Sequence, residues 1–261
     1  MEILYSSKKI IPFNNSILTV GSYDGIHLGH KKILSTLVAK SKIYKLSSVL
    51  VTFDPHPRSV LNRNPNNLQL IMDLEQKLRI IEDLGINFVY IIKFTKNFSK
   101  ITAEEFMAKI IIPNFQPEII LTGVNHFFGK NRGGSPRFLK EYCQRHNIEL
   151  TIIQPVMKSK SEISSSNIRS LITSGHIKKA NNLLGAHFCI EGVVVHGSGR
   201  GSLLNFQTAN IIPKEKNQLL PKKGVYLVLG RINGLNTFGM CNIGVRPTFG
   251  ENKLVVEIHF F

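Results

Sequence analysis

Two histidines three residues apart, His27 and His30, have the residue type and spacing best suited to chemistry on a phosphate. They lie in the segment G-S-Y-D-G-I-H-L-G-H (residues 21–30), which follows the apolar run 17–20 and precedes a helical pattern. Side chains at i and i+3 share one face of a helix, so both imidazoles can point toward one ligand. A helix N-terminus also offers free N–H groups and a partial positive charge, which favour phosphate. We therefore expect a nucleotide phosphate site here, rather than a surface turn with two solvated histidines.

Strand-like and helical segments alternate through the first part of the chain, up to about residue 185. After the run at 17–20, four further strands are predicted, at Ser48–Phe53, Phe88–Phe94, Glu118–Thr122 and Glu149–Gln154. Two helices are predicted to begin at capping-box spacings, Asp73-x-x-Gln76 and Thr102-x-x-Glu105. This alternation predicts a Rossmann-like α/β domain with a parallel sheet. Ligands of such sheets bind at the carboxyl ends of the strands, and the histidine turn falls at such an end.

The pattern changes after two further helical stretches, 166–174 and 177–184, the second with Gly185 as its C-cap candidate. Helical periodicity then stops and short apolar runs recur. These runs are Ile190–Val195, Gly224–Leu229, Thr237–Ile243 and Leu254–Phe261. Asn233-Gly234 between two of them is a strong hairpin signal. We therefore predict a small antiparallel β-barrel and divide the chain into two domains, 1–185 and 186–261.

Composition and charge exclude several classes of protein. With 261 residues, 43% of them hydrophobic, the chain is expected to be neither disordered nor fibrous. No apolar run has the length of a membrane span, so we expect no membrane partner. The net charge of +16 suits an enzyme with polyanionic ligands, and a nucleic-acid-binding protein is the minor alternative. Three widely spaced cysteines favour reduced thiols and a cytoplasmic protein, and an oligomer is possible.

Seven segments, in order along nearly the whole chain, resemble the bifunctional bacterial riboflavin kinase/FMN adenylyltransferase family, also called FAD synthetase. The segments are G-S-Y-D-G-I-H-L-G-H, V-T-F-D-P-H-P-R, T-G-V-N-H-F-F-G-K, I-S-S-S-N-I-R-S, L-L-G-A-H-F-C-I-E-G-V-V-V-H-G, F-Q-T-A-N-I and N-I-G-V-R-P-T-F-G. Seven matches in register are far more specific than any one of them. The resemblance implies phosphorylation of riboflavin to FMN by ATP and Mg²⁺, and then transfer of AMP from a second ATP to FMN, giving FAD and pyrophosphate.

The resemblance assigns roles in the first domain. His27 and His30 match the family's ATP-phosphate histidines, and Arg169 matches the basic residue of its second phosphate motif, so these three are the expected catalytic residues. The remaining ATP-binding candidates are Gly21, Tyr23, Asp24, Gly25, Gly29, Ser164, Ser165 and Ser166. An arginine can donate two hydrogen bonds to one phosphate, whereas the serines also suit ordinary helix N-capping. The flavin-binding candidates are His56, Pro57, Arg58 and Asn125, for which a rigid structural loop is the alternative. A lone loop histidine such as His126 is expected to be solvated.

The second domain resembles a riboflavin kinase. Glu257 matches the family's catalytic base, which accepts the proton of the ribityl 5′-hydroxyl as that oxygen attacks the γ-phosphate. Thr208 and Asn210 match its metal- and phosphate-binding pair, and their oxygens are ligands suited to Mg²⁺. The nucleotide candidates of the glycine-rich turn are Gly197, Gly199 and Gly201. The alternative for Glu257 is an outward-facing glutamate on a strand.

Two departures from the family pattern concern the second domain. Asn205 and Gln207 replace the usual glycine and proline just before Thr208, which changes the backbone freedom there. Family members continue beyond the Glu257 strand, whereas this chain stops at Phe261, so we expect a C-terminally incomplete kinase domain. One alternative is therefore an FMN adenylyltransferase with an inactive remnant of a kinase domain. Another is a different H-x-G-H nucleotidylyltransferase that acts on a sugar or pantetheine phosphate, although the second-domain motifs argue against it.

Overall fold

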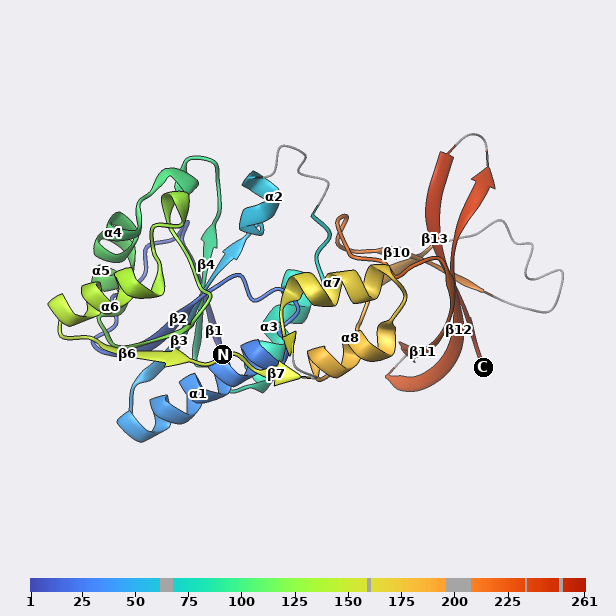
Figure 1. Ribbon diagram of the computed structural model, residues 1–261. Helices are drawn as coiled ribbons and strands as arrows, with labels where there is room; N and C mark the ends of the chain where they lie inside the picture. The colour runs from blue at the N-terminus through green and yellow to red at the C-terminus, as the bar shows by residue number, and fades with distance from the viewer. Residues whose placement is uncertain (62–67, 159–160, 196–207, 233, 249–250) are drawn as a thin grey trace. The chain divides into compact units, whose positions relative to one another are not determined.

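The computed structural model describes residues 1–61, 68–158, 161–195, 208–232, 234–248 and 251–261. Contacts divide the chain into two compact units, which are described separately (Figure 1). The first unit comprises Met1–Gln69 and Asp73–Ser165, and the second comprises Leu70–Met72 and Ser166–Phe261. The three glycines predicted to contact nucleotide, Gly197, Gly199 and Gly201, lie outside the described residues, as do Asn205 and Gln207.

A six-stranded parallel sheet forms the centre of the first unit. Its strands are β1 (Glu2–Tyr5), β2 (Ser16–Val20), β3 (Ser47–Asp54), β4 (Phe88–Lys93), β5 (Pro117–Gly123) and β6 (Glu149–Ile153), in the order β1-β4-β3-β2-β5-β6. Every neighbouring pair runs parallel, so the predicted parallel sheet is confirmed. The five predicted strands are all present. Strand β1 was not predicted; it is a short edge strand with only three apolar residues, and most of its residues are exposed.

Helices cover both faces of this sheet (Figure 1). Helix α1 (Leu28–Tyr44) packs on one face, against β2, β3 and β5. On the other face, α6 and the continuous segment α4-η3-α5 share one apolar core with the central strands. The bounds are α4 (Ala103–Phe106), η3 (Met107–Ile111), α5 (Ile112–Phe115) and α6 (Pro136–Arg145), and the shorter pieces are α2 (Pro57–Leu61), η2 (Phe98–Lys100) and η4 (Lys130–Arg132). Burial on both faces explains the nearly continuous apolar runs of β2, β3 and β4.

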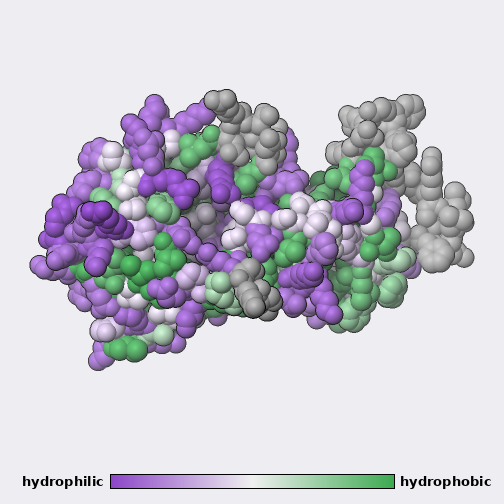
Figure 2. All heavy atoms as spheres, viewed as in Figure 1, coloured by the Kyte–Doolittle hydropathy of each residue, from purple (hydrophilic) through white to green (hydrophobic). Residues whose placement is uncertain are grey.

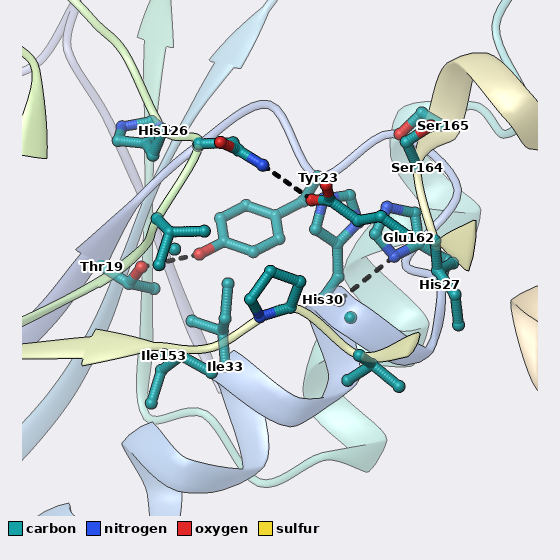
Figure 3. A pocket seen from close by; sticks show the side chains of 18 of the residues that line it. Thr19, Tyr23, His27, His30, Ile33, His126, Ile153, Glu162, Ser164 and Ser165 are labelled. Carbon is teal, nitrogen blue, oxygen red and sulfur yellow. Dashed lines mark hydrogen bonds between the residues drawn. The ribbon is translucent and has the colours of Figure 1, made fainter. Parts of the chain in front are cut away.

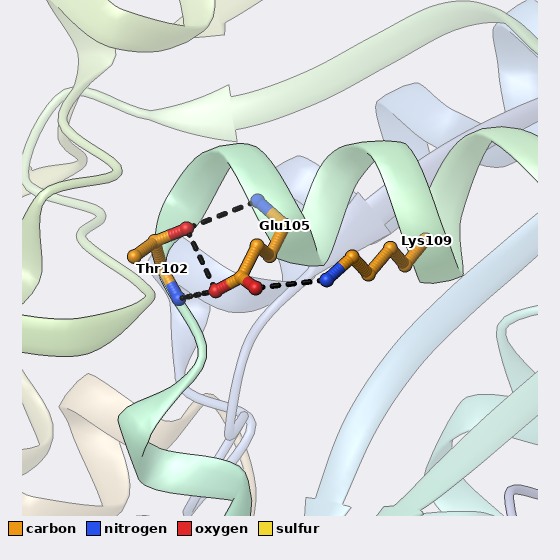
Figure 4. A network of polar contacts seen from close by, with 3 residues as sticks. All are labelled: Thr102, Glu105 and Lys109. Atoms are coloured by element: carbon orange, nitrogen blue, oxygen red, sulfur yellow. Dashed lines mark hydrogen bonds and ion pairs between the residues drawn. The ribbon is translucent and has the colours of Figure 1, made fainter.

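The predicted helix starts are confirmed by their capping contacts. At α3 (Leu74–Asp83), the Asp73 carboxylate accepts a hydrogen bond of 2.7 Å from the Gln76 backbone N–H. At α4, Thr102 and Glu105 form a reciprocal capping box (Figure 4). The second carboxylate oxygen of Glu105 pairs with Lys109, which further stabilises this exposed helix start.

The strand order places a topological switch point between β2 and β5. From β2 the chain passes through α1 to β3 on one side, and β5 later pairs with the opposite side of β2. In open α/β sheets the crevice at such a point, outside the carboxyl ends of the strands, is where ligands bind. The segment 21–30 follows β2 directly at this crevice. The small hairpin of β7 (Met157–Lys158) and β8 (Ser161–Glu162) follows β6.

The second unit contains two helices and a five-stranded antiparallel sheet. Helix α7 (Ser165–Thr173) begins at the last residue of the first unit, and α8 (Ile177–Leu184) ends at Gly185, whose φ of 64° confirms the predicted C-cap. The strands are β9 (Gly192–Val195), β10 (Ala209–Pro213), β11 (Gly224–Ile232), β12 (Leu235–Thr248) and β13 (Glu251–Phe260), in the order β11-β12-β13-β10-β9. Strand β10 was not predicted, because its apolar run is only Ile211-Ile212, flanked by Asn210 and Pro213.

The chain reverses between β11 and β12 as the hairpin signal predicted, because Ile232 pairs with Leu235. Asn233 itself lies outside the described residues. One face of the sheet carries a small core around Cys241, Ile243 and Val256. The opposite face carries a row of apolar side chains that are 48–75% exposed: Val225, Leu227, Leu229, Phe238 and Met240. Figure 2 shows this apolar surface over β11 and β12.

Candidate active site

The two histidines of the turn after β2 lie together at the start of α1, as their spacing predicted. Their rings are stacked with centroids 3.7 Å apart (Figure 3). His27 is the N-cap of α1, and its Nδ1 accepts a hydrogen bond of 3.3 Å from the His30 backbone N–H. Since Nδ1 is the acceptor, the proton of a neutral His27 ring resides on Nε2. The cap therefore leaves Nε2–H as a donor for a ligand.

Burial keeps these imidazoles neutral near pH 7. It lowers the pKa of His27 to about 4, and it lowers the pKa of His30 well below its usual range, with further contributions from His27 and Lys77. His30 Nδ1 is buried and has no hydrogen-bond partner among the described residues. A buried polar atom without a partner costs about 1–3 kcal/mol, and a bound ligand can recover this energy. The site therefore offers a ligand the neutral, largely buried N–H groups of two imidazole rings as hydrogen-bond donors.

A cavity of about 280 Å³ lies against these rings, at the carboxyl ends of β2, β5 and β6. This volume is near the lower end of the range for small-molecule sites, ~300–1,000 Å³. The residues that line the cavity include Gly21, Tyr23, His27, Gly29, His30, Asn125, His126, Glu162, Ser164 and Ser165. The segments 19–33, 123–126, 153–156 and 162–165 thus meet at one place, the switch-point crevice outside the carboxyl ends of the strands (Figure 3).

Most of the predicted ATP-binding residues line this cavity. Asp24 and Gly25 belong to the turn beside it, and Ser166 and Arg169 lie on α7. Asp24 is 2% exposed, and its backbone carbonyl accepts a hydrogen bond of 2.9 Å from Ser165 Oγ. Gly25 has a φ of 87°, which only glycine adopts freely, and its role is to close the turn. Ser166 and Arg169 lie on α7 in the second unit, so their contact with the phosphates remains a prediction.

Of the predicted flavin-binding residues, Asn125 alone lines the cavity. Its amide nitrogen donates a hydrogen bond of 2.8 Å to Glu162, which stands at the same cavity. His56, Pro57 and Arg58 follow β3 but do not line it. There His56 Nδ1 accepts from the Arg58 backbone N–H at 3.1 Å. This contact fits the structural-loop alternative, and flavin binding by the segment remains a prediction.

The sequence predicted that His126 is solvated, and it did not identify Glu162 or Lys77 as residues near the site. His126 lines the cavity rather than facing solvent: burial lowers its pKa to about 4, and its Nε2 has no partner among the described residues. Glu162 gave no signal, because its hairpin has no periodic pattern. Lys77 did give a signal in the sequence, because it is a charged residue on the apolar stripe of its helix. It lies three residues after Leu74 and four before Ile81.

The second unit brings together the two residues that were predicted for phosphoryl transfer. Asn210 on β10 pairs directly with Glu257 on β13, and Asn242 on β12 pairs with Glu257 from the other side. Directly opposed side chains point to the same face of a sheet. Asn210 is 6% exposed, and Thr208 lies just before β10. The carboxylate and the two amides thus form one row beside the apolar side chains of β11 and β12.

Replacing Gly29 by alanine should raise the KM for ATP about tenfold, because displaced catalytic groups lose much of their effect. A Cβ on Gly29 would lie 3.1 Å from Cε1 and Nδ1 of His27, which would push that ring off its stack with His30. The helix itself should gain stability, since alanine is the better helix former. Steady-state kinetics combined with thermal unfolding checks this. A stable variant with an unchanged KM would contradict the proposed role of the stack.

The stability of the first unit should decrease as the pH falls from about 6.5 to about 4. In this window the unfolded chain binds protons that folded His27 and His126 do not, so each residue removes about 3 kcal/mol from the free energy of unfolding. Below about pH 4 both states are protonated at His27 and His126, so the contribution of these two residues ends there. Urea unfolding as a function of pH measures this decrease. His27→Asn keeps a good N-cap and should flatten the curve, whereas an unchanged slope would refute the assignment.

Comparison with known proteins agrees with this geometry. A family model described as FAD synthetase matches residues 11–167, and one described as riboflavin kinase matches residues 184–261. A relative from Buchnera aphidicola, named a bifunctional riboflavin kinase/FMN adenylyltransferase, is 35% identical over 100% of this chain and 84% of its own. The protein of that name from Listeria monocytogenes is 33% identical over 94% of this chain and 77% of its own.

A solved structure from Streptococcus pneumoniae, named a macrolide-efflux protein, is 29% identical with a TM-score of 0.90, and the match covers 100% of this chain and 85% of that chain. In the part of this chain that the structure describes, no helix is long and apolar enough to cross a membrane. The parallel sheet, the histidine turn at its switch point and the antiparallel unit define a two-unit nucleotide-binding transferase. The chain belongs to the bifunctional riboflavin kinase/FMN adenylyltransferase family.

Proposed function

We propose that this chain makes FAD in two steps, phosphorylating riboflavin to FMN and then adenylylating FMN. The observation that carries the second step is the stacked pair of neutral histidines at the N-terminus of α1, on the wall of the switch-point cavity. The observation that carries the first step is the row of Asn210, Glu257 and Asn242 across three neighbouring strands. Each step thus has its own site.

In adenylyl transfer, a phosphate oxygen of FMN attacks the α-phosphorus of ATP, and the bond from that phosphorus to the bridging oxygen breaks. Pyrophosphate leaves with the electron pair of that bond. The reaction needs no protein nucleophile, so the task of the site is to align the phosphates and stabilise the charge that develops on them. The Nε2–H of His27 and the ring of His30 donate to those oxygens. Ser164 and Ser165 add hydroxyls, and Arg169 adds a bidentate guanidinium.

Asn125 and the 56–58 segment are proposed to contact the flavin nucleotide. Asn125 reaches the cavity from the end of β5, and its hydrogen bond to Glu162 fixes the orientation of its amide. The free amide oxygen then accepts from the ligand. His126, beside it on the same turn, adds a neutral imidazole whose ring is held by stacking on Phe128 at 5.8 Å.

In riboflavin phosphorylation, Glu257 is proposed to accept the proton of the ribityl 5′-hydroxyl. That oxygen attacks the γ-phosphorus of ATP, and ADP leaves. Thr208 and Asn210 offer hard oxygen ligands that suit Mg²⁺, which retains several waters and phosphate oxygens as its other ligands. A Mg²⁺ ion held there would neutralise charge on the phosphates. The exposed apolar side chains Leu227 and Met240 lie on the same face as Glu257 and can cover an aromatic ring.

We also propose a domain boundary, a cellular location and the class of ligand that the charge attracts. We place the functional boundary at 185/186, just after the Gly185 cap and close to residue 184, where the riboflavin kinase match begins. The three cysteines form no disulfide, and Cys143 and Cys241 are buried, which favours a cytoplasmic location. The charge of +16 attracts the phosphates of ATP and FMN rather than nucleic acid. Oligomerisation is compatible with both sites.

Isotope tracing tests the proposed function. With FMN and ATP labelled at the α-phosphate, the label should appear in FAD; with riboflavin and ATP labelled at the γ-phosphate, it should appear in FMN. Phosphate esters of sugars and of pantetheine serve as competing acceptors. Labelled FAD and FMN without labelled sugar or pantetheine products would support both sites. Transfer of AMP to one of those esters in preference to FMN would contradict the flavin assignment.

A further inference from the structure

Lys77 is a buried lysine that the proposed mechanism has not yet used. It lies on the second turn of α3 and is only 6% exposed. Lysines are almost never this buried unless they are paired, because removing an ammonium from water is costly. Burial accordingly lowers the pKa of Lys77, and the nearby carboxylates of Asp24 and Asp54 oppose this change. Because burial of this ammonium is unfavourable, we expect Lys77 to have a function at this position.

The ammonium of Lys77 contacts the backbone of the segment 21–30, which carries the two histidines. Nζ donates a hydrogen bond of 2.9 Å to the backbone carbonyl oxygen of Ser22, which lines the cavity, whereas Lys77 does not. The acidic neighbours are Asp24, 2% exposed within the turn, and Asp54 at the end of β3. Helix α3 thus places the ammonium of Lys77 against the backbone of the segment 21–30.

The turn needs such an anchor, because its backbone is unusual. Tyr23 and Ile26 have φ values of 49° and 28°, in the region that side-chain-bearing residues rarely adopt. Such conformations persist only when the surrounding structure holds them. The Tyr23 hydroxyl bonds with Thr19 Oγ1 at 2.7 Å, and Ser165 holds the Asp24 carbonyl. The contact from Lys77 combines a hydrogen bond with a positive charge.

Lys77 also acts on His30. The groups that face the His30 imidazole are the rings of His27 and Tyr23 and the charged or titratable side chains of Lys77 and His126. Of these, Lys77 is a lysine whose positive charge lowers the pKa of His30. A positive charge nearby disfavours the protonated imidazole. Lys77 therefore helps to keep His30 neutral.

We propose that Lys77 is a positioning residue for adenylyl transfer, which holds the Ser22 carbonyl so that the turn presents His27 and His30 to the phosphates. This inference rests on the proposed adenylyltransferase function. Lys77→Met removes both the donor and the charge, and Lys77→Gln keeps a donor without the charge. Each should lower kcat/KM for FAD formation about a hundredfold, as expected for misplaced catalytic groups. Riboflavin phosphorylation in the second unit should be unchanged.

The matched control is Arg79→Met, which removes an exposed cation from the same helix and should leave FAD formation unchanged. Titration of ¹³C-labelled histidines by NMR is the second readout. In Lys77→Gln the His30 resonance should titrate at a higher pH than in the wild type, which a merely structural role would not produce. If Lys77→Met does not fold, as judged by circular dichroism, Lys77→Gln decides the question.

A folded Lys77→Gln variant with wild-type kcat/KM and an unchanged His30 titration would overturn the inference. Failure of the proposed function itself looks different, because the wild-type chain would then form no FAD from FMN. An active wild type with an impaired Lys77→Gln variant and an intact Arg79→Met variant supports both the function and the role of Lys77.

Discussion

Replacing His30 by alanine will lower FAD formation from FMN by a factor of at least about a hundred, the usual cost of removing one donor to a charged transition state. His30 lies between His27 and Tyr23, with ring centroids at 3.7 and 5.0 Å, and its buried Nδ1 has no partner in the described part of the chain. The folded protein therefore loses no hydrogen bond of that ring when it is removed. The secondary structure should persist while kcat falls.

The control for this variant is His146→Ala. His146 is an exposed histidine of the same unit that stacks on Tyr142, away from the cavity. Its removal should leave FAD formation unchanged. Initial rates at saturating ATP and FMN, with circular dichroism as the check on folding, make the comparison. A folded His30→Ala variant that keeps substantial activity would show that the histidine site is wrongly assigned.

Replacing Glu257 by glutamine will lower riboflavin phosphorylation by at least about a hundredfold, because a general base contributes roughly 10²–10⁴ in rate. Glutamine has nearly the same shape and keeps a polar side chain opposite Asn210 and Asn242, the residues that pair with Glu257 across the sheet. It cannot accept the hydroxyl proton. Adenylylation of added FMN uses the first unit and should proceed at the wild-type rate.

Glu215→Gln is the matched control in the same unit, since the Glu215 carboxylate accepts a hydrogen bond from the Asn217 backbone at the turn after β10. FMN formed from riboflavin is measured for both variants. If the wild type and Glu257→Gln form equal amounts of FMN, Glu257 is not the base. If the wild type forms none, the alternative of an inactive kinase domain replaces the two-step proposal.

Apolar patterns predicted the positions of the central elements well. Strands β2, β3 and β4 are buried on both faces and therefore have continuous apolar runs, and the starts of α3 and α4 were marked by Asp73 and Thr102. Strands β1 and β10 escaped prediction because edge position or shortness removes the pattern. The strand order, and with it the switch point, depends on contacts distant in sequence that no local pattern encodes.

The candidate site was predictable where local spacing fixes geometry. His27 and His30 are held by one helix start, so their stacking follows from three residues of separation. His126 and Glu162 reach the cavity from a turn and a hairpin that only the tertiary fold brings there. Lys77 could have been noticed as a charge on an apolar stripe, but the Ser22 carbonyl that it contacts is 55 residues away in sequence.

Product chromatography of the purified chain tests the central claim most directly. One sample receives riboflavin, ATP and Mg²⁺, and a parallel sample receives FMN in place of riboflavin. The account predicts that FMN appears first from riboflavin, that FAD follows, and that FAD forms without delay in the FMN sample. Absence of FAD from both samples would contradict it.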